Sequence, residues 1–351
     1  MDNKKTFILF FILMSIIYIY ATEEVDVSYF RNYFYRLKLL GERYKIDVEN
    51  LTIGEIEEEF EKLIEPPEEK LVVIPEFKNM KYGKYKDNLI DIWTPEVSGK
   101  KPVFVYFHGG SFITDDKKDL PKDLLKKCLE NGIIFASANY RTANTAPYPA
   151  AMYDALTVVK YLRKNSDFYE IDEKRIAVGG NSSGGTLALW LATHDDVSLP
   201  DYPGSIANIS GKICGALCID PITSVDPFFI SRVISEKGLF IPFFLPFYNV
   251  INNNELRQQQ IRLKISDANP YSNINRGDYP VYMEFIGDVE NDFDGNSLTQ
   301  GKILHHANLG EYFYKKYKKA NNKIYFYYKG NPAPKDSRIN FIKEAIWEAD
   351  R

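Results

Sequence analysis

A serine flanked by glycines is the feature of this sequence that most directly predicts chemistry. The run Gly180-Asn181-Ser182-Ser183-Gly184 follows an apolar, strand-like stretch and precedes an apolar helical stretch. Small neighbours let the backbone make a strained strand-to-helix turn, which lifts the serine hydroxyl above a sheet. The Ser183 N–H at the start of the helix would then stabilise an oxyanion. We interpret Ser182 as a nucleophile, with an ordinary glycine-rich turn as the alternative.

A second motif, His108-Gly109-Gly110-Ser111-Phe112, follows the apolar run at 102–107. A glycine pair after a strand lets backbone N–H groups turn inward toward an anion, which is typical of an oxyanion loop. We therefore expect Gly109 and Gly110 to supply oxyanion N–H groups and His108 to support the loop. The two motifs lie about 70 residues apart, and together they are far more specific than either alone.

The segments around these motifs predict an α/β fold. Strand-like runs at 71–77, 89–95, 102–109, 133–140 and 175–183 alternate with helical stretches at 120–131, 150–165 and 183–194. Three more strand-like runs follow at 212–220, 279–287 and 322–330. Strands alternating with helices of this length indicate βαβ units and a mostly parallel central sheet with helices on both faces.

With these motifs the chain resembles the hormone-sensitive-lipase-like branch of the α/β-hydrolases, which includes arylacetamide-deacetylase-type esterases. Further matching segments are Leu89–Pro95, Asn139-Tyr140-Arg141 with Pro149–Asp154, and Asp267–Ser272. The resemblance covers roughly residues 85–335. It implies an α/β-hydrolase fold, and esterase chemistry without a metal or organic cofactor. It also implies a helical cap built from N-terminal helices at about 27–64 and an insertion at about 225–265.

The resemblance places the acid of a catalytic triad three residues after Gly287, at Glu290. A carboxylate there would hold the tautomer of a histidine and stabilise its charged form. Acids cluster in this loop, so Asp288 and Asp292 are alternatives. A solvated acidic loop without any catalytic role would have the same composition.

The histidine that the family places after its last strand is absent. The family pattern is G-x-P-H, and this chain has Ala333 after Gly330-Asn331-Pro332. No histidine follows His306, and His194 is expected far from the site. His305 and His306 remain as possible substitute bases if their segment folds back over the serine. A polar position at a helix start is their other interpretation.

The missing histidine leaves two functional hypotheses. A serine hydroxyl is a poor nucleophile without an adjacent base. The chain is therefore either a serine carboxylic-ester hydrolase with an unconventional base, acting on small or acyl esters, or an inactive hydrolase-fold protein that binds a ligand or partner through the retained pocket. Whether His305 or His306 comes within hydrogen-bond reach of Ser182 discriminates between them.

Composition excludes other classes. The net charge is −4, with 44 basic and 48 acidic residues and no basic stripe, so we expect no nucleic-acid partner. The three cysteines, Cys128, Cys214 and Cys218, show no metal-ligand spacing, and we expect no metal. We expect a small-molecule ester or lipid-like ligand. The aromatic run at 239–249 would be a cap wall lining an acyl pocket, a membrane-contacting patch, or ordinary core.

The N-terminal segment predicts export from the cytosol. Two lysines precede the apolar run at 6–21, and acidic residues follow it. This arrangement is typical of a secretory signal peptide over residues 1–21. An uncleaved anchor, which would associate with a membrane through residues 6–21, and a buried core helix are the alternatives. Residues 22–351 are expected to form one hydrolase domain, secreted or membrane-anchored.

Overall fold

The computed structural model describes residues 74–196, 206–290 and 292–348. The chain divides into two compact units, Met1–Val72 and Val73–Arg351, and the described residues all belong to the second. The predicted signal segment at 1–21 and the predicted helices at 27–64 lie outside the described residues. None of the helices in the described part is both long enough and apolar enough to span a membrane.

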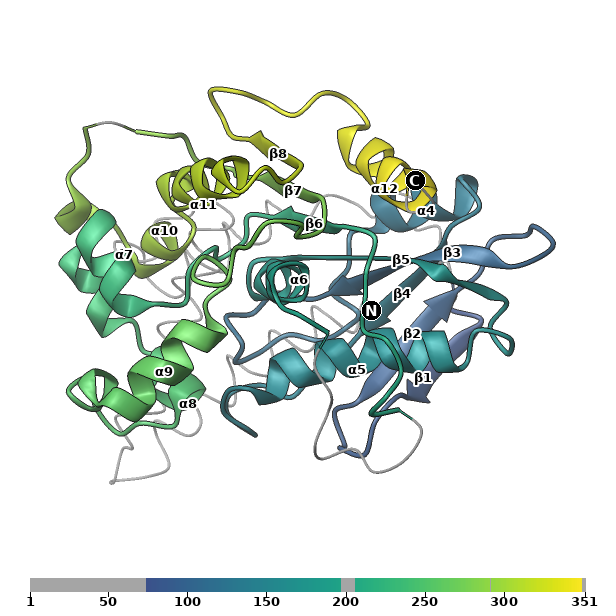
Figure 1. Cartoon of the computed structure of the whole chain (residues 1–351), viewed down its shortest axis with the longest axis horizontal. Coiled ribbons are helices and arrows are strands. Elements are labelled where there is room, and N and C mark those ends of the chain that lie inside the picture. Colours follow the sequence, from purple (N-terminus) through teal and green to yellow (C-terminus); the bar gives the residue numbers. More distant parts are fainter. Residues whose placement is uncertain (1–73, 197–205, 291, 349–351) are drawn as a thin grey trace, which may run out of the picture. The chain divides into compact units, whose positions relative to one another are not determined.

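An eight-stranded sheet forms the centre of this unit (Figure 1). Its order is β1-β2-β4-β3-β5-β6-β7-β8, and every pair from β4 to β8 is parallel. Only β1 with β2 and β2 with β4 are antiparallel. The strands are β1 (Phe77–Lys81), β2 (Leu89–Trp93), β3 (Lys101–Phe107), β4 (Ile134–Ala138), β5 (Ile171–Asn181), β6 (Ala216–Ile219), β7 (Val281–Glu284) and β8 (Ile324–Tyr327). The predicted α/β-hydrolase fold is thereby confirmed, although the first strand begins at Phe77, where the predicted run at 71–77 ends.

Helices cover both faces of the sheet because its inner strands bury side chains on both sides. In β3, Val103 and Val105 pack into one apolar cluster, whereas Phe104 packs into the other. Alternation along a strand sends successive side chains to opposite faces. Figure 1 shows α4 (Lys122–Glu130) and α12 (Ser337–Glu348) on one face, and α5 (Ala150–Lys164) and α6 (Ser183–Thr193) on the other.

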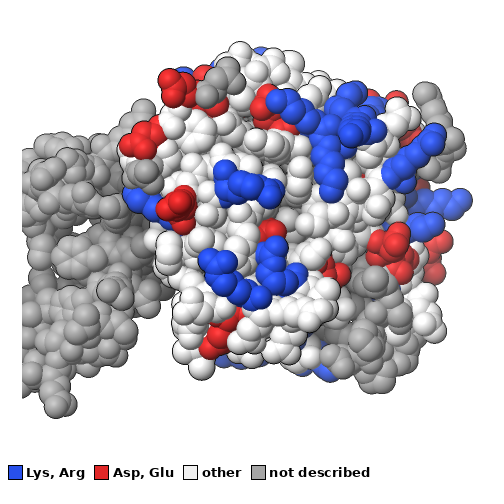
Figure 2. Space-filling model, turned by 60° about the vertical axis from the view of Figure 1, so that its left-hand side comes forward, with Lys and Arg blue, Asp and Glu red and all other residues white. Residues whose placement is uncertain are grey.

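Short helices fill the connection between β6 and β7. They are α7 (Pro227–Val233), η1 (Glu236–Phe240), α8 (Phe244–Tyr248), η2 (Glu255–Arg257) and α9 (Gln259–Ala268). The helices between β7 and β8 are η3 (Gly295–Ser297), α10 (Gln300–Leu304) and α11 (Ala307–Lys319). Figure 2 shows this side of the molecule, where basic and acidic side chains are interspersed over a largely uncharged surface.

The aromatic run at 239–249 belongs mainly to the core. Phe243, Phe244 and Phe247 are at most 3% exposed. The Phe247 ring lies 4.8 Å from that of Phe112, which follows the glycine pair of the predicted oxyanion loop. The residues between β6 and β7 therefore support this loop by ordinary apolar packing.

Candidate active site

Ser182 occupies the sharp turn between β5 and α6. Its φ of 52° lies in the left-handed region, which is costly for a residue with a side chain. Two flanking glycines allow the close approach that this turn requires. A Cβ added to Gly184 would lie 2.0 Å from the Phe107 carbonyl oxygen, and one added to Gly180 would lie 2.4 Å from the Gly184 carbonyl carbon. The spacing of the motif is thus a direct consequence of steric contact with the end of β3.

The loop after β3 lies beside the nucleophile. A Cβ added to Gly109 would lie 3.4 Å from Ser182 Cβ, so the Gly109 backbone is immediately adjacent. Gly110 has a φ of 94° and its carbonyl oxygen accepts from Ile113 N at 2.8 Å, which turns the loop back on itself. Ser183 is the first residue of α6, where backbone N–H groups have no partner within the helix. Of the three predicted oxyanion residues, Gly109 and Ser183 therefore lie next to the serine, and Gly110 follows Gly109 in the same loop.

Tyr140 ties this loop to the start of α6. Its buried hydroxyl lies 3.0 Å from the His108 carbonyl oxygen, 3.1 Å from that of Gly109 and 3.3 Å from Ser183 Oγ. The His108 ring stacks on the Tyr140 ring at 4.4 Å, and its Nδ1 donates to the Gly109 carbonyl oxygen at 2.9 Å. Burial lowers the pKa of His108, which favours a neutral ring. His108 thus supports the loop, and Tyr140 is a positioning residue that the sequence alone did not reveal.

His305 supplies an imidazole to the serine. It follows α10, and its Nε2 lies 3.2 Å from Ser182 Oγ. Its Nδ1 lies 2.7 Å from the backbone carbonyl oxygen of Asp220. A carbonyl oxygen only accepts hydrogen bonds, so a neutral His305 carries its proton on Nδ1. Nε2 is then an unprotonated acceptor facing the serine hydroxyl, as a general base requires.

Asp220 is the carboxylate beside His305, and sequence reasoning missed it. Its Oδ2 lies 3.5 Å from His305 Nδ1, and the Ile286 N–H donates to its Oδ1 at 3.4 Å. Asn181 and Ile219, the last residues of the parallel strands β5 and β6, are paired in the sheet. Ser182 and Asp220 each follow one of these residues directly and therefore lie side by side. Burial raises the pKa of the Asp220 carboxyl, and the neighbouring His305 lowers it. An acid directly after a buried strand was the available signal.

The acids of the loop after β7 contact other partners. Glu290 is exposed, and its backbone N–H and carbonyl oxygen bond the Asn308 side chain at 2.9 and 2.7 Å. Asp288 Oδ1 accepts from its neighbour Val289 N at 2.9 Å and from Gly330 N at 3.2 Å. Asp292 is exposed. The structure brings none of the three side chains into a hydrogen bond with His305.

The remaining candidate histidines have structural partners. His306 is 7% exposed, begins α11 by accepting from Asn308 N at 3.3 Å, and packs on Phe293. Burial lowers the pKa of His306. His194 stacks on Trp190 at 4.1 Å, and its Nδ1 and Nε2 lie 2.9 Å and 2.8 Å from the carbonyl oxygens of Trp190 and Asp267. Of the two substitute bases considered, His305 is the one that reaches Ser182.

Known proteins match part of this chain in sequence. The BD-FAE family model matches residues 90–214. Carboxylesterase NlhH of Mycobacterium tuberculosis is 30% identical over 158 residues, which are 41% of this chain and 48% of the relative. Human arylacetamide deacetylase-like 2 is 34% identical over 93 residues, which are 25% of this chain and 23% of the relative. The chain thus spans less than half the length of these curated relatives.

Solved structures of low sequence identity share the fold. A truncated carbohydrate esterase from gut microbiota matches with a TM-score of 0.59 and 16% identity, covering 82% of this chain and all of that one. An acetyl ester-xyloside bifunctional hydrolase from Caldicellulosiruptor lactoaceticus gives 0.56 and 15%, covering 80% of this chain and 96% of that one. Together with the sheet order, these matches show that the chain has an α/β-hydrolase fold, and part of it is similar in sequence to the two curated esterase relatives named above.

Proposed function

We propose that the protein is a serine carboxylic-ester hydrolase that acts on small or acyl esters. The observation that carries the proposal is the 3.2 Å contact between Ser182 Oγ and His305 Nε2, with the Nδ1 proton of His305 directed at Asp220. The nucleophile Ser182 contacts the base His305, and the base contacts its orienting group at Asp220. Acyl transfer by a serine requires such a chain of hydrogen bonds.

The reaction follows from these positions. Nε2 of His305 takes the proton of Ser182 as Oγ attacks the ester carbonyl carbon, and the carbonyl oxygen becomes an oxyanion. The N–H groups of Gly109, Gly110 and Ser183 stabilise that charge. The tetrahedral intermediate expels the alkoxide, which receives the proton from His305 and leaves as the alcohol. Water, deprotonated by His305, then attacks the acyl-serine, and the acid is released as Ser182 regains its proton.

The base comes from a different part of the chain than in the family pattern, where Ala333 replaces the histidine. The loops after β7 and β8 still contact each other, because Lys329 N donates to the Gly287 carbonyl oxygen at 3.0 Å and Gly330 N to Asp288. His305 instead comes from the connection between β7 and β8. Its contact with Ser182 favours the hydrolase over the alternative of an inactive binding protein.

The position of Asp220 fits the same constellation. The segment after β6 presents both a main-chain carbonyl oxygen and a carboxylate to His305 Nδ1. The carbonyl sets the tautomer, and the carboxylate stabilises the imidazolium that forms during attack. Glu290, the acid expected from the resemblance, bonds to Asn308 through its backbone and is not needed in this scheme.

The proposal is tested by titration of the purified protein with diethyl p-nitrophenyl phosphate. We expect release of one p-nitrophenol per chain and a diethylphosphoryl adduct on the peptide that contains Ser182, detected by mass spectrometry. The Ser182→Ala variant should show neither. Absence of an adduct on the folded wild-type protein, together with no turnover of p-nitrophenyl acetate, would overturn the proposal in favour of a binding protein.

A further inference from the structure

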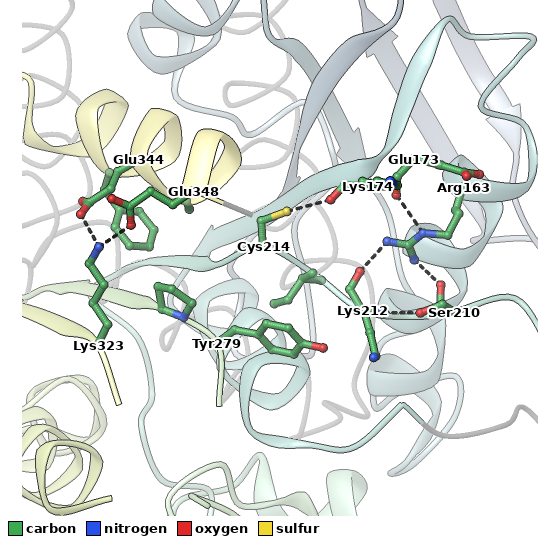
Figure 3. A pocket seen from close by; sticks show the side chains of 14 residues that line it. Arg163, Glu173, Lys174, Ser210, Lys212, Cys214, Tyr279, Lys323, Glu344 and Glu348 are labelled. Atoms are coloured by element: carbon green, nitrogen blue, oxygen red, sulfur yellow. Dashed lines mark hydrogen bonds and ion pairs between the residues drawn. The ribbon is translucent and has the colours of Figure 1, made fainter. Parts of the chain in front are cut away.

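A second site lies at the opposite edge of the sheet from Ser182. A groove with a volume of about 610 Å³ opens at the amino ends of β5, β6, β7 and β8, beside α12 (Figure 3). Lys174 of β5 lines this groove, whereas Asn181 ends the same strand next to Ser182. At roughly 3.3 Å per residue the two ends are about 23 Å apart. The groove is therefore separate from the ester-hydrolysing site.

The groove has an apolar floor of a size that suits a small ligand. Ile213, Phe341 and Ala345 are at most 5% exposed and form part of its wall. The Tyr279 ring and Pro280 add further apolar surface. A volume of a few hundred cubic ångströms with mainly apolar walls and a few polar groups is typical of small-molecule sites.

The two ends of the groove differ in charge. At one end Lys323 is paired with both Glu344 and Glu348, which leaves that end with a net negative charge. Figure 3 shows three basic residues, Arg163, Lys174 and Lys212, and one acid, Glu173, at the other end, with the Tyr279 hydroxyl directed toward it. Within the part of the chain that the structure describes, the Lys212 ammonium forms no ion pair. The three basic side chains outnumber the single acid, and the nearby Asp196 is paired with Lys160, so this end has a net positive charge that favours an anion.

The segment carrying Lys212 is held in place before any ligand arrives. The Arg163 guanidinium donates to the carbonyl oxygens of Glu173 at 3.0 Å, Lys212 at 2.6 Å and Ser210. The Lys212 N–H donates to Ser210 Oγ at 3.2 Å. These bonds fix the backbone of the lysine at the mouth of the groove. A preorganised site spends less binding free energy on ordering its own residues.

We propose that this groove binds a small amphipathic monocarboxylate. The carboxylate would lie between the Lys212 ammonium and the Tyr279 hydroxyl, and the alkyl or aryl body would cover Pro280 and Phe341. The negative end formed by Glu344 and Glu348 would repel a second carboxylate, so a dicarboxylate of the same length should bind worse. The site takes its ligand whether or not Ser182 is active.

The test is isothermal titration calorimetry of the full chain with decanoate, decanol and decanedioate. We expect decanoate to bind at least tenfold more tightly than either of the other two. The Lys212→Glu variant should weaken decanoate binding at least tenfold, and Lys318→Glu, a change of another exposed lysine on α11, should leave it unchanged. Because Lys212 is exposed, its replacement should not disturb folding, and circular dichroism checks this.

The Lys212→Glu variant separates this proposal from the proposed function, since it should lose decanoate binding and keep turnover of p-nitrophenyl acetate, whereas Ser182→Ala should do the reverse. Decanoate binding that survives Lys212→Glu unchanged would place the ligand elsewhere and overturn the proposal. Equal affinity for decanoate and decanol, or no binding of decanoate at millimolar concentration, would also overturn it. None of these results bears on turnover at Ser182.

Discussion

Because the Asp220 carbonyl oxygen also contacts His305, loss of the Asp220 carboxylate should lower kcat less than it does in the usual triad. In the usual triad, replacing the aspartate with asparagine costs about 10⁴ in turnover because the histidine adopts the wrong tautomer. Here the carbonyl oxygen at 2.7 Å holds the His305 Nδ1 proton, while the carboxylate oxygen lies 3.5 Å away. Asp220→Asn removes the charge but keeps the carbonyl, so the tautomer should persist.

The expected magnitude follows from the lost attraction for the imidazolium. Two unit charges 3.5 Å apart interact by about 1 kcal/mol in water and about 5 kcal/mol at an effective dielectric constant near 20. The His305 and Asp220 side chains are 24% and 15% exposed, which places the pair between these limits. We therefore expect kcat to fall by about ten- to a few-hundred-fold.

The assay is steady-state hydrolysis of p-nitrophenyl acetate by the wild-type protein, Asp220→Asn and Glu290→Gln. Glu290→Gln is the matched control and should stay within about twofold of wild type, because the Glu290 side chain is exposed and its bonds to Asn308 use the backbone. A loss of 10⁴ or more in folded Asp220→Asn would show that the carboxylate sets the tautomer. A larger loss in Glu290→Gln than in Asp220→Asn would assign the acid to Glu290 instead of Asp220.

Three further predictions concern the support of the site and the stability of the fold. Tyr140→Phe removes the hydroxyl that bonds the His108 and Gly109 carbonyl oxygens, so kcat should fall several-fold with little change in KM, and a raised KM at unchanged kcat would contradict this. Lys117→Met leaves the buried Asp91 without its ion-pair partner at 2.7 Å, so the free energy of unfolding in urea should fall by about 3 kcal/mol. Adding Asp91→Asn should partly restore it. A fall below about 1 kcal/mol in the single variant would contradict this prediction. Burial raises the pKa of Asp278 to about 6, so ionisation costs stability as pH rises from about 4 to 6, and Asp278→Asn should raise Tm at pH 7 but not at pH 4. Equal Tm shifts at both pH values would contradict the last prediction.

The elbow and the oxyanion loop could be predicted from sequence because their glycines obey local steric requirements. Gly180 and Gly184 contact backbone within a few ångströms, and that restriction is visible as a short motif. The strands around them were recognisable as apolar runs for a similar reason, since a parallel sheet buries both faces. The sheet order fits the fold that those runs indicated.

The acid and the base depend on tertiary placement, which short motifs do not encode. Asp220 is next to Ser182 only because β5 and β6 are neighbours in register. His305 reaches the serine because the connection between β7 and β8 folds back over the carboxyl ends of the strands. His306 is one residue away and caps a helix instead. The direction of the backbone between α10 and α11 decides which of the two adjacent histidines faces Ser182.

Two asparagine substitutions at adjacent positions test directly whether His305 is the base. His305→Asn removes the base, whereas His306→Asn keeps a side chain that can begin α11. With p-nitrophenyl acetate we predict that His305→Asn loses roughly 10⁴- to 10⁶-fold in kcat, as Ser182→Ala does, and that His306→Asn stays within about threefold of wild type. Full activity in His305→Asn beside an inactive Ser182→Ala would contradict this assignment and show that another group is the base.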